Sequence, residues 1–232
     1  MNSFDASIIF YVNRLSRESL VFDHFMGYMT QYNLLKGGVL ALFIWRIWFR
    51  EGDLGRKYVT AAIISSLAAI AVARGLALSL PYRARPLHEA SLAFIVPYGV
   101  SPKLLDGWSS FPSDHAVLFF CLSTGIFFAS RRLGAIALAY SALFICLPRV
   151  YLGFHYPTDI LAGAALGVFI AWAGNAYCAR SRAFMSSYRW LDLRPGLFYP
   201  GLFLVTYQIA DLFDSGRGAL SGAVDLLEMT LA

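Results

Sequence analysis

Three short clusters of polar residues interrupt an otherwise apolar sequence, and their side chains are of the types that handle phosphate. In chain order the clusters contain Arg74, Arg83 and Arg85, then Ser113, Asp114 and His115, and finally Arg149, His155 and Asp159. Arginine matches phosphate oxygens with two parallel hydrogen bonds and keeps its charge. Histidine can act as a nucleophile or transfer a proton. The clusters together predict a phosphate site with the groups needed for phosphoryl transfer.

The third cluster combines a nucleophile with a group that could orient it. Asp159 follows His155 by four residues, close enough for the carboxylate to bond one imidazole nitrogen. The other nitrogen is then unprotonated and directed outward, as in a catalytic triad. We therefore expect His155, Asp159 and His115 to be catalytic, with His115 transferring protons.

Two prolines mark helix starts beside the clusters. Pro112 suits the first position of a helix, so the backbone N–H groups of Ser113, Asp114 and His115 would be free to face phosphate. Pro157 likewise opens the helix that carries the second aspartate. We expect Ser113 and Asp114 to belong to the substrate-binding set with Arg74, Arg85 and Arg149.

Taken singly, the clusters have plainer interpretations. Arg83 and Arg85 could anchor a helix at the membrane surface, and Asp and His side chains could hold a metal ion. Several arginines around one site disfavour a cation, so the sequence predicts no metal and no cofactor. The net charge of +5 is not gathered into a basic cluster with interleaved aromatic residues, so no nucleic-acid partner is expected.

The elements that position the clusters are predicted to be membrane helices. Of the 232 residues, 58% are hydrophobic and only 14% are charged, against about 25% charged in typical soluble domains. Six apolar segments cover residues 34–49, 58–80, 116–130, 133–148, 160–179 and 196–213. Residues 4–30 have the mixed composition of an amphipathic helix at the membrane surface. We expect an all-α bundle of about six spans, with residues 1–232 in a single membrane-embedded domain.

Two details of the apolar segments carry expectations of their own. Lys36 and Arg46 in the first segment would snorkel to the membrane surface. Gly163 and Gly167 form a GxxxG pair, which is typical of closely packed membrane helices.

The charges between the segments predict the orientation of the bundle. The basic loops contain Arg50, Arg56 and Lys57, then Arg131 and Arg132, and then Arg180, Arg182, Arg189 and Arg194. All three loops lie on one side if each intervening segment crosses, and the positive-inside rule makes that side cytoplasmic. Residues 81–115 and 149–159, which hold most of the site, then face the periplasm or the exterior of an inner (plasma) membrane.

The clusters resemble the three signature motifs of the type 2 phosphatidic acid phosphatase superfamily, the integral-membrane lipid phosphatases. Pro112-Ser113-Asp114-His115 is similar to the family's Pro-Ser-Gly-His motif. Its Ser-Arg-x5-His-x3-Asp motif is matched in spacing by Arg149, His155 and Asp159, with Pro148 in place of the serine.

The first motif of the family, Lys-x6-Arg-Pro, is matched only in part. Arg85-Pro86 is present, but Leu78 occupies the lysine position. Arg74 lies one helical turn earlier on the same helix face. We expect Arg74 to reach the site in place of the lysine.

The resemblance implies a mechanism and a substrate class. His155 would form a phosphohistidine while Asp159 holds its ring, and His115 would protonate the leaving oxygen and then activate water. Relatives with Pro-Ser-Asp-His point to a lipid phosphate, with undecaprenyl diphosphate as first choice. The alternatives are a phosphatidylglycerophosphate, phosphatidic acid or lipid A phosphatase, a lipid phosphotransferase, and a non-catalytic lipid-binding or transport protein.

Overall fold

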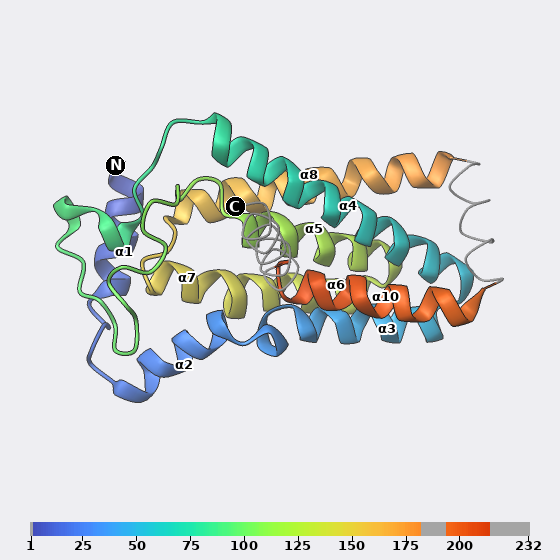
Figure 1. The fold of residues 1–232 in the computed structure, drawn as a ribbon, viewed down its shortest axis with the longest axis horizontal. Helices are drawn as coiled ribbons and strands as arrows, with labels where there is room; N and C mark the ends of the chain where they lie inside the picture. The colour runs from blue at the N-terminus through green and yellow to red at the C-terminus, as the bar shows by residue number, and fades with distance from the viewer. Residues whose placement is uncertain (1, 182–193, 214–232) are drawn as a thin grey trace, which may run out of the picture.

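The computed structural model describes residues 2–181 and 194–213, and every regular element in these ranges is a helix (Figure 1). In chain order they are α1 (Ser3–Asn13), α2 (Leu20–Gln31), the π-helix η1 (Leu34–Gly38), α3 (Val39–Arg50), α4 (Gly52–Ser79), the 3-10 turns η2 (Pro86–His88) and η3 (Ala90–Leu92), α5 (Asp114–Ala129), α6 (Arg131–Tyr140), the π-helix η4 (Ser141–Cys146), α7 (Leu147–Tyr151), α8 (Pro157–Arg180) and α10 (Pro195–Ala210). The predicted all-α fold class is confirmed for these residues.

Each of the six predicted apolar segments is helical. Among the described residues, three stretches are long and apolar enough to cross a membrane: Gly52–Ser79, Arg131–Tyr151 and Pro157–Cys178. The second of these joins α6, η4 and α7 end to end, and α5 is a shorter apolar helix. The site residues therefore lie at the ends of long apolar helices.

The long helices run back and forth, so the loops fall at two opposite ends of the bundle. Residues 80–113 and 152–156 lie at one end, with α1 beside them; we call this the motif end (Figure 1). The turns at residues 50–52 and 129–131 lie at the other end, together with the start of α10. The polar clusters and the described basic loops at residues 50–57 and 131–132 thus lie at opposite ends, whereas residues 182–193 of the third predicted basic loop lie outside the described residues.

Close packing of α8 on α5 brings two of the clusters together. A Cβ atom on Gly163 would lie 2.8 Å from the carbonyl oxygen of Ser113, and one on Gly167 would lie 2.3 Å from that of Val117. Only glycine allows this approach, which confirms the packing role predicted for the pair. The backbone N–H of Ser113 also donates to the carbonyl of Asp159, at 3.4 Å. The first turns of α5 and α8 are consequently neighbours.

The amino-terminal segment differs from the single helix predicted over residues 4–30. Arg17 has a left-handed φ of 66°, which ends the first helical stretch. Ser19 then caps α2 by accepting a hydrogen bond from Phe22 N. The segment is therefore two helices joined by a turn.

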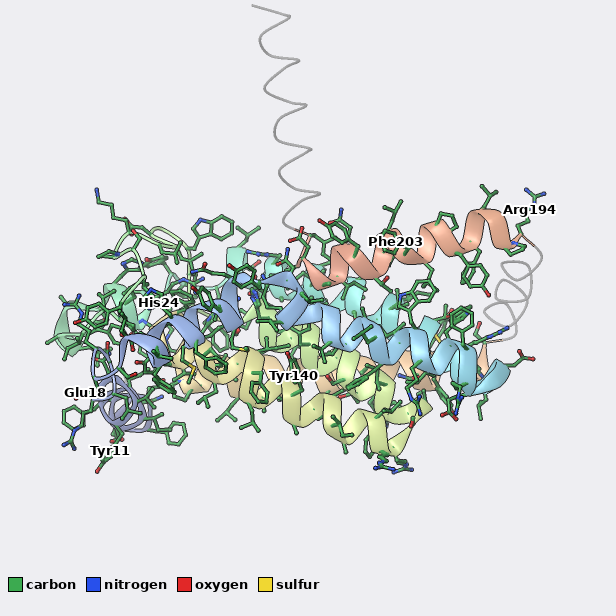
Figure 2. All side chains as sticks on the ribbon, turned by 90° about the horizontal axis from the view of Figure 1, so that it is seen from below. Tyr11, Glu18, His24, Tyr140, Arg194 and Phe203 are labelled. Atoms are coloured by element: carbon green, nitrogen blue, oxygen red, sulfur yellow. The ribbon has the colours of Figure 1, made fainter. Side chains whose placement is uncertain are left out.

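Both amino-terminal helices are built into the motif end. α1 packs on α7 and α8, and α2 packs on α7; Figure 2 shows Glu18 and His24 at this end and Arg194 at the opposite one. Asp5 on α1 and Asp23 on α2 are fully buried. Because buried carboxylates need partners, these helices must be held by the rest of the fold.

Candidate active site

A cavity of about 410 Å³ opens at the motif end, between α4, α5, α7 and the loops. Its charged or titratable lining residues are Lys36, Arg74, Arg85, Asp114, His115, Arg149 and His155. Six of the eight predicted site residues therefore meet in one cavity. Ser113 and Asp159 are fully buried and are absent from its lining.

The ring of His155 is oriented by a backbone carbonyl. Nδ1 lies 2.8 Å from the carbonyl oxygen of Ser110. A carbonyl only accepts hydrogen bonds, so Nδ1 carries the proton and Nε2 carries a lone pair. Nε2 lies 3.4 Å from Nη1 of Arg85, among the residues that line the cavity. This is the protonation pattern that a nucleophilic imidazole needs.

The direct hydrogen bond predicted between His155 and Asp159 is not formed. Nδ1 lies 3.8 Å from Oδ2 of the carboxylate. In the first turn of α8, Oδ2 instead accepts a hydrogen bond from the backbone N–H of Tyr156, at 2.8 Å. Asp159 therefore supplies negative charge beside the ring, while the carbonyl of Ser110 sets its orientation.

The carboxylate of Asp159 is held by residues that lie outside the three motifs. Nη1 of Arg83 lies 2.5 Å from Oδ1 of Asp159, and Nη2 lies 2.7 Å from Oδ2 of Asp5. Thr158 also donates to Asp5, from its hydroxyl at 2.6 Å and its backbone N–H at 3.0 Å. Arg83 thus neutralises two fully buried carboxylates.

Sequence reasoning missed this network. It assigned Arg83 no role beyond that of a surface anchor and gave none to Asp5. The one available signal was an aspartate within an apolar amino-terminal helix, and its partners lie far away in the sequence.

Burial lowers the pKa of the His155 imidazole below its ordinary value, and the charges of Arg85 and Arg149 add to this effect. Asp159 offsets part of it. The ring is therefore neutral at neutral pH, and its lone pair is available for attack.

His115 belongs to a second His–Asp pair with different contacts. Its Nδ1 lies 2.9 Å from Oδ1 of Asp114, and its Nε2 accepts a hydrogen bond from Nη2 of Arg149. The other carboxylate oxygen of Asp114 lies 2.7 Å from Nη2 of Arg74. Asp114 therefore holds an imidazole and a guanidinium at the cavity wall, and its own charge disfavours direct contact with phosphate.

Arg74 reaches the cavity from α4, and its guanidinium lies 5.2 Å from the ring centroid of Trp108. Trp108 is thus part of the cavity wall. Leu78, at the family's lysine position, is 88% exposed. A guanidinium from one turn earlier on α4 therefore faces the cavity.

Arg85 connects the loops around the site. Its guanidinium donates to the backbone carbonyls of Trp108 at 3.1 Å, Ser109 at 3.1 Å and Phe154 at 2.6 Å. Burial lowers its pKa, but from so high a value that it stays charged. Arg85 thus fixes the loops while keeping its charge beside Nε2 of His155.

The start of α5 differs in register from the prediction. The helix begins at Asp114, and Ser113 is its N-cap, whose hydroxyl accepts a hydrogen bond from Ala116 N at 3.4 Å. Pro112 therefore precedes the cap and does not occupy the first helical position, because serine is the better capping residue. Ser113 shapes the helix start from behind the cavity wall.

A second cavity, of about 650 Å³, adjoins the first. The two share Arg74, Arg85, Trp108, Asp114 and His155 as lining residues. The second is also lined by apolar side chains at the end of α4, namely Ala73, Ala77, Leu78 and Leu80. An apolar space thus leads directly to the charged one.

Comparisons with known proteins agree with the three clusters. The family model described as PAP2 superfamily matches residues 58–183. Undecaprenyl-diphosphatase BcrC of Bacillus subtilis (strain 168) is 26% identical over 161 residues, covering 69% of this chain and 77% of the relative. Bacitracin transport permease protein BcrC of Bacillus licheniformis is 28% identical over 168 residues, covering 70% and 76%.

A solved structure, the transmembrane PAP2-type phosphatidylglycerolphosphate phosphatase from Bacillus subtilis, matches with a TM-score of 0.47 and 18% identity, covering 77% of this chain and 86% of that one. The matched family region, residues 58–183, contains every cluster described above. The chain therefore belongs to the PAP2 superfamily of lipid phosphatases.

Proposed function

We propose that this protein removes the terminal phosphate of a lipid diphosphate, with undecaprenyl diphosphate as the first candidate, through a phosphohistidine on His155. One observation carries the proposal: the Ser110 carbonyl holds the proton on Nδ1, so the lone pair of Nε2 lies beside Arg85 in a cavity lined with cations. A neutral imidazole beside guanidinium groups is suited to attack on phosphorus.

In the first step, Nε2 of His155 attacks the terminal phosphorus. An N–P bond forms, the bond from phosphorus to the bridging oxygen breaks, and the lipid monophosphate leaves with the electron pair while its oxygen takes a proton from His115. Arg85 and Arg149 neutralise the equatorial oxygens of the transferring group. Asp159 stabilises the positive charge that develops on the ring.

In the second step, water attacks the phosphohistidine, inorganic phosphate leaves and His155 is restored. His115 accepts the proton of that water at Nε2. A phosphoryl group beside Arg149 would compete for the guanidinium that now donates to this nitrogen, and that competition would free Nε2 for proton transfer. Asp114 keeps the ring in place from the opposite side.

The apolar second cavity supports a lipid substrate, because it adjoins the charged cavity at His155 and Arg85. A lipid chain there would leave its phosphate beside the nucleophile. The Bacillus subtilis relative is named as an undecaprenyl-diphosphatase, which favours undecaprenyl diphosphate among the possible lipids.

Metal-independent chemistry is part of the proposal. Within residues 2–181 and 194–213 there is no group of three or more His, Cys, Asp or Glu side chains arranged to hold a metal ion. The arginines supply the positive charge that a metal would otherwise contribute.

We infer that the protein lies in the inner (plasma) membrane with the motif end facing the periplasm or the exterior, because the described basic loops at residues 50–57 and 131–132 lie at the opposite end. Single cysteines introduced at exposed positions 82 and 131 test this orientation. In a background without the native cysteines, an impermeant thiol reagent added to intact cells should label only position 82. Labelling of position 131 alone would place the motif end in the cytoplasm.

The activity is tested with purified protein in detergent and a panel of lipid phosphates. The panel contains undecaprenyl diphosphate, undecaprenyl phosphate, phosphatidylglycerophosphate, phosphatidic acid and lipid A, each with and without a sugar or lipid hydroxyl acceptor. Release of inorganic phosphate and an acid-labile phosphoryl group on the wild-type enzyme, lost in His155→Ala, are expected. Transfer to the acceptor without release would identify a phosphotransferase, and turnover without the labile intermediate would rule out the covalent route.

A further inference from the structure

Trp108 lies where the charged cavity meets the apolar one, and it belongs to none of the three motifs. The lining residues that the two cavities share are Arg74, Arg85, Trp108, Asp114 and His155. All of them except Trp108 carry an ionisable side chain. Trp108 is thus the apolar residue at the junction between the two spaces.

The backbone of Trp108 is fixed close to the nucleophile. Nε of Arg85 donates to the carbonyl of Trp108 at 3.1 Å, and Nη2 of the same guanidinium donates to the carbonyl of Ser109 at 3.1 Å. Ser110, in the same loop, orients His155 through its own carbonyl. The loop that carries Trp108 is therefore bonded to the residues that form the phosphate site.

The side chain of Trp108 remains accessible although its backbone is fixed. The residue is 54% exposed. The guanidinium carbon of Arg74 lies 5.2 Å from the ring centroid, within the range of a cation–π contact, and Asp114 holds the same guanidinium. This contact orients the indole ring and leaves more than half of the residue's surface open to another group.

The place of the ring corresponds to the point where a bound lipid changes from phosphate to hydrocarbon. On the function proposed above, the phosphate lies beside His155 and Arg85, and the chain lies in the apolar cavity. A residue that lines both spaces then lies beside the first carbon atoms of the chain. The small side chains of Ala73 and Ala77 on α4 line the apolar cavity as well, which leaves room for a chain next to the ring.

We propose that Trp108 is a specificity-determining residue, whose indole ring packs against the first carbon atoms of the lipid chain and so favours lipid phosphates over phosphates without a chain. A tryptophan suits this role because it offers a large, rigid apolar face. Resting on the proposed function, this role adds a substrate contact outside the motifs. Trp108 recognises the start of the chain and not its length.

The test measures kcat/KM in one detergent for methyl diphosphate, which has no chain, and for geranyl and farnesyl diphosphate. In Trp108→Ala, kcat/KM for both prenyl compounds should fall about tenfold, as expected for loss of one aromatic packing contact. The value for methyl diphosphate should hardly change. The fall should be equal for geranyl and farnesyl diphosphate, because both have the same first carbon atoms. Trp108→Phe, which keeps an aromatic ring, should recover most of the loss.

Inhibition of farnesyl diphosphate turnover supplies a second measurement that needs no turnover of a compound without a chain. In Trp108→Ala, inhibition by geranylphosphonate should weaken about tenfold, whereas inhibition by methylphosphonate should stay the same. Damage to the phosphate site itself would weaken both inhibitors equally.

The matched control is Trp172→Ala on α8. Trp172 is 58% exposed, close to the value for Trp108, but it lines neither cavity. Exposed tryptophans also serve as anchors at the membrane surface, and loss of an anchor would affect all substrates alike. Trp172→Ala should therefore leave the preference for prenyl compounds unchanged.

Four outcomes would overturn the role of Trp108: equal losses on compounds with and without a chain, no loss, a loss that grows from geranyl to farnesyl diphosphate, or the same pattern in Trp172→Ala. A wild-type enzyme that acts equally well on all three diphosphates would overturn this role alone. Release of phosphate from none of them by the wild-type enzyme would overturn the proposed function as well.

Discussion

The two His–Asp pairs of the cavity are similar in composition but are held in opposite ways. The backbone carbonyl of Ser110 orients His155. Its partner Asp159 is fully buried and is held by Arg83 and by the backbone N–H of Tyr156. His115 bonds directly to its neighbour Asp114, and its other nitrogen bonds Arg149, which also lines the cavity.

The contacts of His155 form the rigid part of the site, whereas those of His115 can exchange partners. A nucleophile benefits from one fixed orientation, and the contacts of His155 come from groups that a substrate cannot displace. A proton-transfer group must release one hydrogen bond and form another during each turnover. The contact between His115 and Arg149 can do this, because phosphate is a stronger acceptor for the guanidinium than imidazole is.

Removal of the nucleophile should have the largest effect. His155→Ala should lower kcat by about 10⁴-fold or more, because it removes the nucleophile that forms the phosphoryl-enzyme intermediate. Phosphate release by purified protein measures it, and an unchanged melting temperature shows that the fold persists. Substantial remaining activity would contradict the covalent mechanism.

His115→Ala should be the next most severe change. Loss of proton transfer costs about 10²–10⁴-fold on the natural lipid, and the loss should be smaller for a substrate with a good leaving group such as p-nitrophenyl phosphate. Parallel measurement of kcat/KM for both substrates distinguishes this role from simple disruption. An equal loss on both would show that His115 does not transfer a proton to or from the reacting groups.

Arg83 offers a way to disturb the pair of His155 and Asp159 without changing either residue. Arg83→Gln leaves two buried carboxylates without their shared cation. We expect a loss in kcat of about 10- to 100-fold, because only part of the roughly 3–5 kcal/mol cost of breaking a buried ion pair falls on the transition state. Asp5→Asn in the same background removes one of those charges and should recover part of the loss. No recovery in the double variant would mean that the charge on Asp5 has no bearing on the site.

Arg74 forms an ion pair with Asp114, the partner of His115. Its replacement tests how far a guanidinium from α4 takes the place of the family lysine. Arg74→Ala should lower kcat/KM about tenfold and weaken inhibition by phosphate and vanadate in parallel. Leu78→Lys in the Arg74→Ala background should recover part of both. Normal turnover and normal inhibition in Arg74→Ala would assign phosphate binding to Arg85 and Arg149 without it.

The smallest expected effect concerns pH. Protonation of His155 removes its lone pair, and burial lowers its pKa, so protonation requires a lower pH than an ordinary histidine does. The acid limb of kcat/KM should therefore fall below the usual histidine value of about 6.5. Arg85→Met should move this limb upward, because it removes a positive charge next to the ring. A limb that stays at the same pH in that variant would argue against His155 as the titrating group.

Local patterns in the sequence were enough to predict most helices and all three clusters, although the break at Arg17 and the start of α5 differ from the prediction. The apolar segments predicted the helices, because backbone groups in lipid must be bonded within a segment. The spacing of Arg149, His155 and Asp159 and the adjacency of Asp114 and His115 identified the clusters. The GxxxG pair predicted close packing, since only small residues let two membrane helices approach.

Only the tertiary structure decided how the clusters are held. Orientation of His155 by Ser110, the bridge from Asp159 through Arg83 to Asp5, and the inward position of Lys36 all join residues far apart in the chain. Arg83, Asp5 and Lys36 each had a satisfactory place at the membrane surface when judged locally. Packing of α1, η1 and α10 around the motif end removes that alternative, because their charged groups must then find partners inside the fold.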